Sequence, residues 1–377
     1  MSEGLCDPAF AGVRDVFDEN LGRGDDLGAG VAVFVDGRLV VDLWGGVADE
    51  RTGRAWAHDT ACVTFSCTKA VTAAAALMLL ERGGPGLEQA VTTWWPDFGR
   101  LGKDGTTLEH LLTHQAGLPA FDRPISAEEA ADPVAMADHL AGQAPDWVPG
   151  TDHGYHALTF GWLVGEYVRR QAGRLVGEFV GDEIAPDLRV GVAADGLPAL
   201  ARIAAGRPLK AADRPAAPDV VARVVAASQD PDSPMTRSTG NPAASFNKPA
   251  LLTAGWPAAG LVTTARGLAD FYRRLVDGTL LSAETVHDAT RERVRGPDRT
   301  LVSDTAFGLG FMRASANLYL PPAARAGAFG HPGASGALGI GDLDAKLAVA
   351  YIPNLTRPAL GDRRAYGLVE AVYAVLA

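Results

Sequence analysis

Residues 64–84, TFSCTKAVTAAAALMLLERGG, place Ser66, Cys67 and Lys69 directly before a run made almost only of helix formers. In a helix, residues three apart lie on one face about one turn from each other, so Ser66 and Lys69 are placed to hydrogen-bond. Burial would keep Lys69 neutral part of the time, and the helix N-terminus would stabilise negative charge that develops near Ser66. The pattern fits a serine nucleophile with a lysine base, and equally a serine that caps a helix beside a solvated lysine.

Ser66 can be compared with two other candidates, a second Ser-x-x-Lys match and the neighbouring Cys67. A second Ser-x-x-Lys match, SFNK at residues 245–248, is followed at once by Pro249 in a loop rich in Pro and Ala, so no helix holds its side chains together. Ser66, in contrast, has a strand-like lead, ACVTF, and a long apolar helix behind it. Cys67 points about 100 degrees around the helix from Ser66, which favours a buried packing role for its thiol.

Strand-like runs occur near both ends of the chain. Residues 31–35 and 38–44 flank an Asp-Gly pair, which is a strong signal for a two-residue hairpin turn. Residues 337–341 and 346–352 repeat the pattern around a polar turn. The final stretch, DRRAYGLVEAVYAVLA, is typical of an amphipathic helix.

The middle of the chain has a helical texture from about residue 69 to residue 172. Thr106 or Thr107 is the expected cap ahead of LEHLLTHQAG, and Gly117 is the expected stop of that helix. From about residue 182 to residue 245 Ala and Pro dominate, which predicts loops and short helices rather than a sheet.

These elements predict an α+β architecture with an antiparallel sheet flanked by helices. The sheet would be built from both chain ends, residues 1–68 and 256–377, and a mostly helical domain, residues 69–255, would be inserted between them. The helical domain would contain the Ala/Pro-rich insert at residues 182–250. A catalytic cleft is expected between the two parts.

Composition limits the classes of function. Of the 377 residues, 47% are hydrophobic and 21% are charged, as in ordinary globular proteins with a well-buried core. The net charge of -11 argues against nucleic-acid binding, which requires an excess of Lys and Arg. The longest apolar run, residues 73–80, is too short to span a bilayer, which takes about 20 residues. We therefore expect neither a nucleic-acid partner nor a membrane segment.

The N-terminal stretch and the cysteines indicate a compartment. Residues 1–20 carry acidic side chains where a secretory signal would carry a basic start and an apolar core. Cys6, Cys62 and Cys67 are too few and too irregularly spaced for a disulfide framework or a metal knuckle. The sequence predicts a cytoplasmic protein with reduced thiols, without a metal or another cofactor.

Two further segments supply groups that a serine and lysine pair would need. In DWVPGTDHGYHALTFGWLVGEYVRR, Tyr155 lies where a loop becomes a helix, which exposes its side chain to a cleft; alternatively its phenol only anchors the loop. In FGHPGASGALGIGD, His331, Pro332 and Gly333 precede a strand, and free backbone N–H groups there would complete an oxyanion hole. A Gly-rich turn that merely enters an edge strand is the alternative.

With these segments in this order, the chain resembles the superfamily of serine β-lactamases and penicillin-binding proteins. More specifically, it resembles the class C β-lactamase-related carboxylesterases known as family VIII esterases. The matching motifs are SCTK with Ser66 and Lys69, YHA with Tyr155, and HPG with His331 and Gly333. The resemblance runs from about residue 10 to residue 375 and includes VVDLWGG, TLEHLLTHQAGLP, WVPGT and GLVTTARGLADFYRRL.

This resemblance implies a β-lactamase-like fold and a serine carboxylesterase. Ser66 would be acylated, Lys69 and Tyr155 would share the general-base work, and the backbone N–H groups of Ser66 and Ala334 would form the oxyanion hole. Water would then attack the acyl-enzyme with Tyr155 as the base. The alternatives are an acyltransferase, a weak β-lactamase or D-amino-acid peptidase, and, from another class, a non-catalytic binding protein.

Two positions depart from the β-lactamases within this resemblance. Where those enzymes usually carry Asn at the third position of the Tyr motif, this chain has Ala157, which removes an amide donor and acceptor. Where they carry Lys, it has His331, which is neutral or only partly charged near neutral pH. Together with Gly333, these are the expected substrate-binding positions, and short-chain esters of small molecules are the expected substrates.

Two other patterns are weaker candidates for a site. GASGA, residues 333–337, comes close to the Gly-x-Ser-x-Gly elbow of α/β-hydrolases, but Ala337 replaces the last Gly and no strand-to-helix turn is suggested at Ser335. His110 and His114 have the spacing of a zinc pair, but HLLTH lacks the Glu of His-Glu-x-x-His and a third ligand. Packing and capping are the favoured roles for these two histidines.

Overall fold

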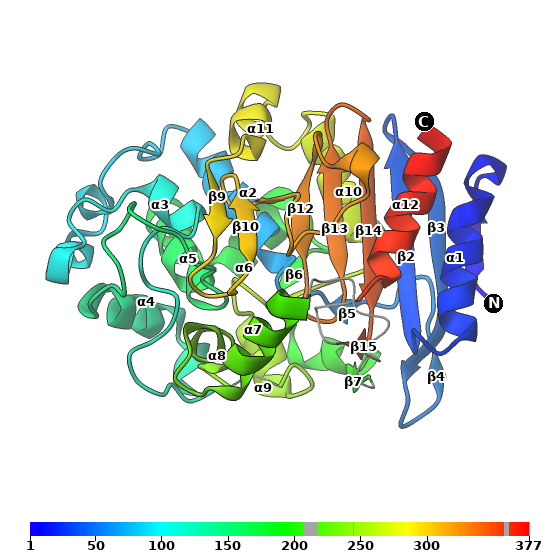
Figure 1. Cartoon of the computed structure of the whole chain (residues 1–377), viewed down its shortest axis with the longest axis horizontal. Coiled ribbons are helices and arrows are strands. Elements are labelled where there is room, and N and C mark those ends of the chain that lie inside the picture. Colours follow the sequence, from blue (N-terminus) through cyan, green and yellow to red (C-terminus); the bar gives the residue numbers. More distant parts are fainter. Residues whose placement is uncertain (207–217, 244, 358–361, 377) are drawn as a thin grey trace.

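The computed structural model describes residues 1–206, 218–243, 245–357 and 362–376. Its main feature is a 10-stranded antiparallel sheet to which both ends of the chain contribute (Figure 1). Nine strands follow one another across this sheet in the order β1 (Glu3–Cys6), β3 (Arg38–Asp49), β2 (Gly28–Val35), β14 (Leu347–Pro353), β13 (Leu338–Asp342), β12 (Ala328–Pro332), β11 (Met312–Arg313), β10 (Asp304–Phe307) and β9 (Val294–Pro297). The tenth, β4 (Arg54–Ala55), pairs with β3. The expected antiparallel sheet from both chain ends is confirmed.

The hairpin between β2 and β3 shows why this sequence forms a sheet here. Asp36 and Gly37 have φ angles of 46 and 75 degrees, the left-handed conformations that a type I′ turn requires and that Asp-Gly tolerates. Along β2, Val31 and Val33 face one hydrophobic cluster, whereas Ala32 faces the other. This alternation with a period of two residues buries both faces of the strand.

Helices cover both faces of the sheet. α10 (Ala265–Val276) packs against β2, β13 and β14 in one cluster, and Gly339 of β13 lets it approach, because a Cβ there would lie 2.3 Å from the Tyr272 ring. α1 (Ala11–Gly22) and α12 (Arg364–Leu376) lie side by side and contribute to the other cluster (Figure 1). The predicted C-terminal helix is therefore confirmed.

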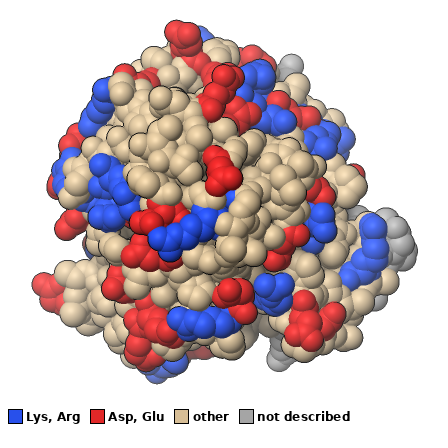
Figure 2. Space-filling model, turned by 90° about the vertical axis from the view of Figure 1, so that its left-hand side faces the viewer, with Lys and Arg blue, Asp and Glu red and all other residues tan. Residues whose placement is uncertain are grey.

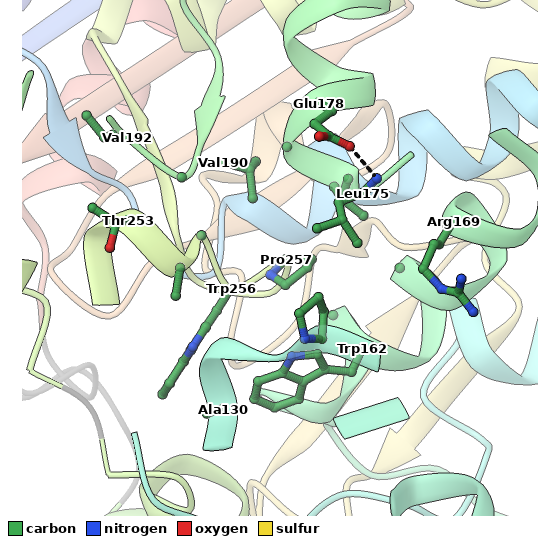
Figure 3. Close-up of a pocket in the computed structure, with 18 of the residues that line it drawn as sticks. Ala130, Trp162, Arg169, Leu175, Glu178, Val190, Val192, Thr253, Trp256 and Pro257 are labelled. Carbon is green, nitrogen blue, oxygen red and sulfur yellow. Dashed lines mark hydrogen bonds between the residues drawn. The ribbon is translucent and has the colours of Figure 1, made fainter. Parts of the chain in front are cut away.

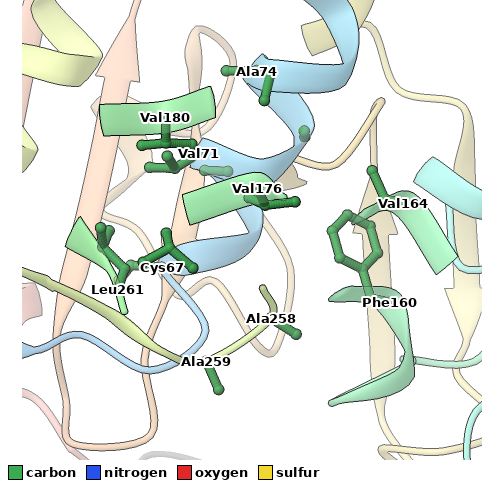
Figure 4. Packing of buried hydrophobic residues seen from close by; sticks show 14 of the residues in the cluster. Cys67, Val71, Ala74, Phe160, Val164, Val176, Val180, Ala258, Ala259 and Leu261 are labelled. Carbon is green, nitrogen blue, oxygen red and sulfur yellow. The ribbon is translucent and has the colours of Figure 1, made fainter. Parts of the chain in front are cut away.

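The middle of the chain is mostly helical. Its helices are α2 (Thr68–Glu81), α3 (Leu108–Leu112), α4 (Pro133–Gly142), α5 (Thr159–Ala172), α6 (Val176–Phe179), α7 (Pro218–Gln229), α8 (Pro234–Gly240) and α9 (Pro249–Ala254), and α11 (Ala283–Thr290) follows after α10. α2 is buried on all sides from Thr68 to Leu79, which explains its nearly continuous apolar sequence. Figure 4 shows its Val71 beside Val176 of α6 and Val180, and α2 also packs against α5.

Two expectations for this region need correction. Thr107 is confirmed as the cap of α3, but α3 ends at Leu112 rather than at Gly117, because the chain turns at His114 with a φ of 61 degrees. The segment after residue 182 also contains two short strands, β6 (Arg189–Val190) and β7 (Ala204–Ala205), which the composition did not predict.

Partners from distant parts of the chain stabilise these short strands. β6 joins β8 (Leu261–Thr263), which in turn pairs with β5 (Cys62–Val63), and β7 pairs in parallel with β15 (Leu355–Thr356). The division of the chain into domains at residues 69 and 255 stays a prediction.

The surface carries both signs of charge. On the face that Figure 2 shows, Asp and Glu side chains lie among Lys and Arg side chains, around areas without charge. In the described part of the chain, no helix has the length and apolar character that crossing a bilayer requires.

Candidate active site

Ser66 lies in a tight turn between β5 and α2. The preceding residue, Phe65, has a φ of 51 degrees, a left-handed conformation that is costly for a large side chain. Thr68 holds this turn from both sides, because its Oγ1 donates to the carbonyl of Phe65 and accepts from the N–H of Leu261. Ser66 is partly exposed as a result, although the helix that follows is buried.

Lys69 lies one helical turn beyond Ser66 and is fully buried. Its Nζ is 3.3 Å from the Ser66 Oγ, 2.7 Å from the Ala157 carbonyl oxygen and 3.0 Å from the Ala258 carbonyl oxygen. Burial lowers the pKa of Lys69 well below its usual value. Among the described residues, no carboxylate lies within ion-pair distance of it.

The contacts of Nζ suit a neutral amine. An –NH2 group has two N–H donors, which match the carbonyls of Ala157 and Ala258, and one lone pair, which can accept from the Ser66 hydroxyl. An ammonium would place three donors and a full charge in a buried site without a counter-ion. The site therefore holds a base within reach of a partly exposed hydroxyl.

Tyr155 completes this group. Its side chain is 6% exposed, and Lys69 Nζ lies 4.8 Å from the centre of its ring. Burial raises the pKa of Tyr155 above its usual value, and a hydrogen bond with the Ser66 side chain opposes that rise only in part. The phenol is protonated at neutral pH, so of the two expected bases only Lys69 has a pKa shift that favours proton acceptance.

Asp298 holds the backbone of Tyr155. Both of its carboxylate oxygens accept from the Tyr155 N–H, at 3.0 and 3.1 Å, and Asp298 itself is 3% exposed. It also accepts from the N–H groups of Thr300 and Leu301 and from the hydroxyl of Thr305. Sequence reasoning missed this residue, since Asp298 lies 143 positions from Tyr155 in a loop without a motif.

His331 is buried beside Tyr155, with 5.8 Å between the ring centres. Burial lowers the pKa of His331 to about 3. Its Nδ1 lies 2.7 Å from the Pro332 carbonyl oxygen, which assigns the proton to Nδ1 and leaves a lone pair on Nε2. His331 is thus neutral, as one of the two states expected for it.

The expected oxyanion donors lie on adjoining segments. Gly333 follows β12 and packs so closely on the segment before Ser66 that a Cβ there would lie 2.2 Å from the Thr64 carbonyl oxygen. Among the described residues, neither the Ser66 N–H nor the Ala334 N–H has a hydrogen-bond acceptor. Ala334 is exposed in the turn that follows Gly333.

Ala157 and Cys67 contribute through burial and backbone contacts. Ala157 is 6% exposed, its carbonyl accepts from Lys69, and its N–H donates to the Ser238 hydroxyl at 3.0 Å. The Cys67 thiol is buried and donates to the His331 carbonyl at 3.2 Å, and burial raises the pKa of this thiol to about 12. This fits the packing role expected for Cys67.

The weaker candidates do not join this group. Ser335 is fully buried, so its hydroxyl is closed to a substrate. The Nδ1 of His110 accepts from the Thr107 N–H in the cap of α3, whereas His114 packs on the rings of Tyr155 and Phe307. Within the described ranges, no three His, Cys, Asp or Glu side chains are grouped to hold a metal ion.

One cavity lies behind the Lys69 site. It has a volume of about 560 Å³, and Trp162, Trp256 and Pro257 are among the residues that line it (Figure 3). The Pro257 carbonyl accepts from the Thr72 hydroxyl at 2.6 Å, and the next carbonyl along the chain accepts from Lys69. A second cavity, about 340 Å³, is lined by Arg51, Phe246 and others. Ser66 lines neither of these two cavities, so the expected cleft at Ser66 stays a prediction.

Comparisons with known proteins extend over nearly the whole chain. A family model described as Beta-lactamase matches residues 13–373. The Esterase/beta-lactamase LipL of Mycobacterium tuberculosis is 34% identical over 367 residues, covering 93% of this chain and 82% of that protein. The crystal structure of a family VIII carboxylesterase is 29% identical and superposes with a TM-score of 0.88 over the whole of both chains. EstA from Arthrobacter nitroguajacolicus Rue61a is 29% identical, with a TM-score of 0.85 over 100% of this chain and 98% of that one.

Proposed function

The chain belongs to the beta-lactamase family, and on that premise we propose that it is a serine carboxylesterase that hydrolyses short-chain esters of small molecules through an acyl-enzyme on Ser66. The observation that carries the proposal is the position of Lys69 Nζ, 3.3 Å from the Ser66 Oγ and hydrogen-bonded to two carbonyls. This arrangement gives a partly exposed hydroxyl a buried neutral base. A binding protein has no use for that pair.

Acylation begins with proton transfer. The Ser66 hydroxyl gives its proton to the Lys69 amine as its oxygen attacks the carbonyl carbon of the ester. The Ala157 and Ala258 carbonyls then accept from the resulting ammonium, and their oxygens partly neutralise its charge in the buried site. The N–H groups of Ser66 and Ala334 stabilise the negative charge on the former carbonyl oxygen.

The proton then passes to the leaving alkoxide. Tyr155 is protonated and its phenol is buried beside Ser66, so it would donate a proton to the departing group. Tyr155 gives its proton to the alkoxide and takes up the proton that Lys69 had received from Ser66, so that both side chains return to their neutral forms. In the second half of the reaction water replaces the alcohol and the same transfers run in the opposite direction, which releases the acid and regenerates the Ser66 hydroxyl.

The environment of His331 and Ala157 favours esters over β-lactams. A neutral imidazole with a pKa of about 3 supplies no positive charge for the carboxylate of a penicillin. Ala157 offers a methyl group where an amide side chain would bind an acylamide substituent. An ester also needs less protonation of its leaving group than an amide, because an alkoxide leaves more readily than an amide anion.

Covalent labelling tests the proposal. The protein is exposed to p-nitrophenyl acetate and to a fluorophosphonate, and the labelled peptide is located by mass spectrometry. We expect an adduct on Ser66 in the wild type, none in Ser66→Ala, and unchanged labelling in Ser245→Ala, which alters the second Ser-x-x-Lys match. An adduct on Ser335 or Ser245, or no adduct at all, contradicts the proposal.

Turnover of p-nitrophenyl esters and of nitrocefin, a β-lactam, compares the two substrate classes directly. We expect the esters to have the higher kcat/KM, and the argument from Ala157 and His331 is wrong if nitrocefin does. A cytoplasmic location also stays a proposal, which fractionation of the native host would test.

A further inference from the structure

The turn that carries the Ala334 N–H contains two peptide groups joined head to tail. The Gly336 N–H donates to the Gly333 carbonyl at 2.9 Å, which closes a β-turn over residues 333–336. The Gly333 carbonyl belongs to the same peptide group as the Ala334 N–H. Because the C=O and N–H of a trans peptide point in opposite directions, this bond aims the Ala334 N–H away from Gly336.

Arg364 continues this chain of hydrogen bonds. Its Nη2 donates to the Ser335 carbonyl at 2.9 Å, and that carbonyl shares a peptide group with the Gly336 N–H. The sequence of donors therefore runs from the guanidinium through the 335–336 peptide and the 333–334 peptide to the Ala334 N–H. All of these dipoles point the same way, so each bond polarises the next.

The guanidinium itself is held in one orientation. Arg364 is 4% exposed and ion-pairs through Nε and Nη2 with both oxygens of Asp362, at 2.9 and 2.6 Å. Nη1 donates to Asp26 at 2.7 Å and to the Asp25 carbonyl at 3.4 Å. With the bond to Ser335, all five N–H donors of the side chain have acceptors.

The turn is also enclosed on two sides. A Cβ on Gly336 would lie 2.5 Å from Arg364 Nη2, and a Cβ on Gly333 would lie 2.2 Å from the Thr64 carbonyl oxygen. The ion cluster thus lies against one end of the turn, and the segment that leads to Ser66 lies against the other.

We propose that Arg364 is a positioning residue for the oxyanion hole, which fixes and polarises the Ala334 N–H through the 335–336 and 333–334 peptide groups. This inference rests on the proposed function. The guanidinium never touches the substrate, and its positive charge strengthens the Ala334 donor at the stage when the carbonyl oxygen becomes negative. A lysine cannot replace it, because one ammonium cannot make the paired bonds to Asp362 and reach Ser335 and Asp26 together.

The test compares three variants of the full chain. Arg364→Met removes both the charge and the hydrogen bonds. Arg364→Lys keeps the charge but loses the paired hydrogen bonds to Asp362. Arg357→Met is the matched control, since Arg357 also binds a carboxylate, Asp25 at 2.7 Å, but does not touch the turn. Active sites are first counted with a fluorophosphonate, and kcat and KM for p-nitrophenyl acetate are then expressed per labelled Ser66.

We expect Arg364→Met to lower kcat per labelled site about 10- to 100-fold, below the 10²- to 10³-fold loss typical of a deleted oxyanion donor. KM should change little, and Arg364→Lys should lose activity in the same direction. The affinity for phenylboronic acid, whose serine adduct carries a negative oxygen, should fall in parallel with kcat/KM. Arg357→Met should leave all three quantities unchanged.

A purely structural role gives a different result. It lowers the fraction of labelled sites and leaves kcat per labelled site as in the wild type, and that result in either Arg364 variant overturns the proposal. If neither variant folds, Asp362→Asn, which loosens the guanidinium without removing it, should lower kcat per site about three- to tenfold, and an unchanged kcat overturns the proposal. Failure of the wild type to label on Ser66 would instead contradict the proposed function.

Discussion

Lys69 shows how strongly burial can change one residue. Its Nζ contacts one hydroxyl and two carbonyls, and no carboxylate among the described residues lies within ion-pair distance of it. A lysine that stabilised the fold through its charge would have a counter-ion, and this one has a pKa well below its usual value. Its environment is suited to chemistry rather than to stability.

The first prediction concerns activity. Lys69→Met should lower kcat for p-nitrophenyl acetate at pH 7 about 10³-fold or more, because the Ser66 hydroxyl loses its proton acceptor. Lys103→Met is the matched control, since Lys103 is equally buried, donates to the Arg100 and Ala141 carbonyls and has a lowered pKa, but lies outside the site. If both variants lose activity equally, the role of Lys69 is wrong.

The second prediction concerns stability against pH. Lys69 has its ordinary pKa of 10.5 in the unfolded chain and a lower pKa in the folded protein. At pH values between these two, Lys69 carries a proton in the unfolded chain that it lacks in the folded protein. The free energy of unfolding of the wild type, relative to Lys69→Met, should therefore rise with pH in that window, by at most about 1.4 kcal/mol per pH unit. Urea unfolding of both proteins across the window measures this difference. A flat or falling difference would show that Lys69 is charged in the folded state.

The third prediction concerns His331. With a pKa of about 3, His331 stays neutral from pH 5 to pH 8, so it contributes no limb to the pH profile of ester hydrolysis there. His331→Gln keeps a donor for the Pro332 carbonyl and should leave the midpoint of the acidic limb unchanged. The pH dependence of kcat/KM for both proteins is the measurement, and a shifted midpoint would mean that His331 titrates in this range.

At the scale of elements, local patterns were predictable and long-range partners were not. The Asp-Gly turn at residues 36–37 and the helix after Lys69 were readable because the chain near them supplies turn residues and helix formers. β6 has two residues and no such pattern, and it exists because β8 lies beside it. For the same reason, no motif identified Asp298 or Arg364, because the contacts that tie them to the site, with the Tyr155 N–H and the Ser335 carbonyl, join residues 143 and 29 positions apart.

The fourth prediction concerns the loop from Asp298 to β10. Asp298→Asn should lower the free energy of unfolding by about 1–3 kcal/mol, because an amide keeps one acceptor oxygen where the carboxylate meets four donors. It should also lower kcat, since the Tyr155 backbone loses its anchor. Urea unfolding and p-nitrophenyl acetate turnover measure the two effects.

Asp304→Asn is the control for this loop, because Asp304 is exposed at the start of β10. Equal losses in both variants would point to a general effect of charge on this part of the molecule. A loss of stability in Asp298→Asn without a loss of kcat would show that the anchor does not position Tyr155.

At the scale of the whole molecule, the proposed division into two domains does not separate two cores. One continuous hydrophobic cluster contains Phe34 and Ile352 from the large sheet together with Leu163 and Val164 from α5. Lys69 depends on both parts, because its carbonyl partners come from residues 157 and 258. The site is therefore formed only when the two parts of the chain fold together.

The last prediction follows from this shared core. Five of the seven tryptophans lie in the helical part, from residue 94 to residue 256. All variants are therefore made in a protein that also carries Trp44→Phe and Trp56→Phe, so that tryptophan fluorescence reports on the helical part alone. Leu163→Ala in α5 and Ile352→Ala in β14 each remove a fully buried side chain, at a cost of about 2–5 kcal/mol. Both should move one urea transition, seen at the same midpoint by fluorescence and by far-UV circular dichroism. If Ile352→Ala leaves the fluorescence midpoint in place, the sheet and the helical part unfold independently, and the core does not join them.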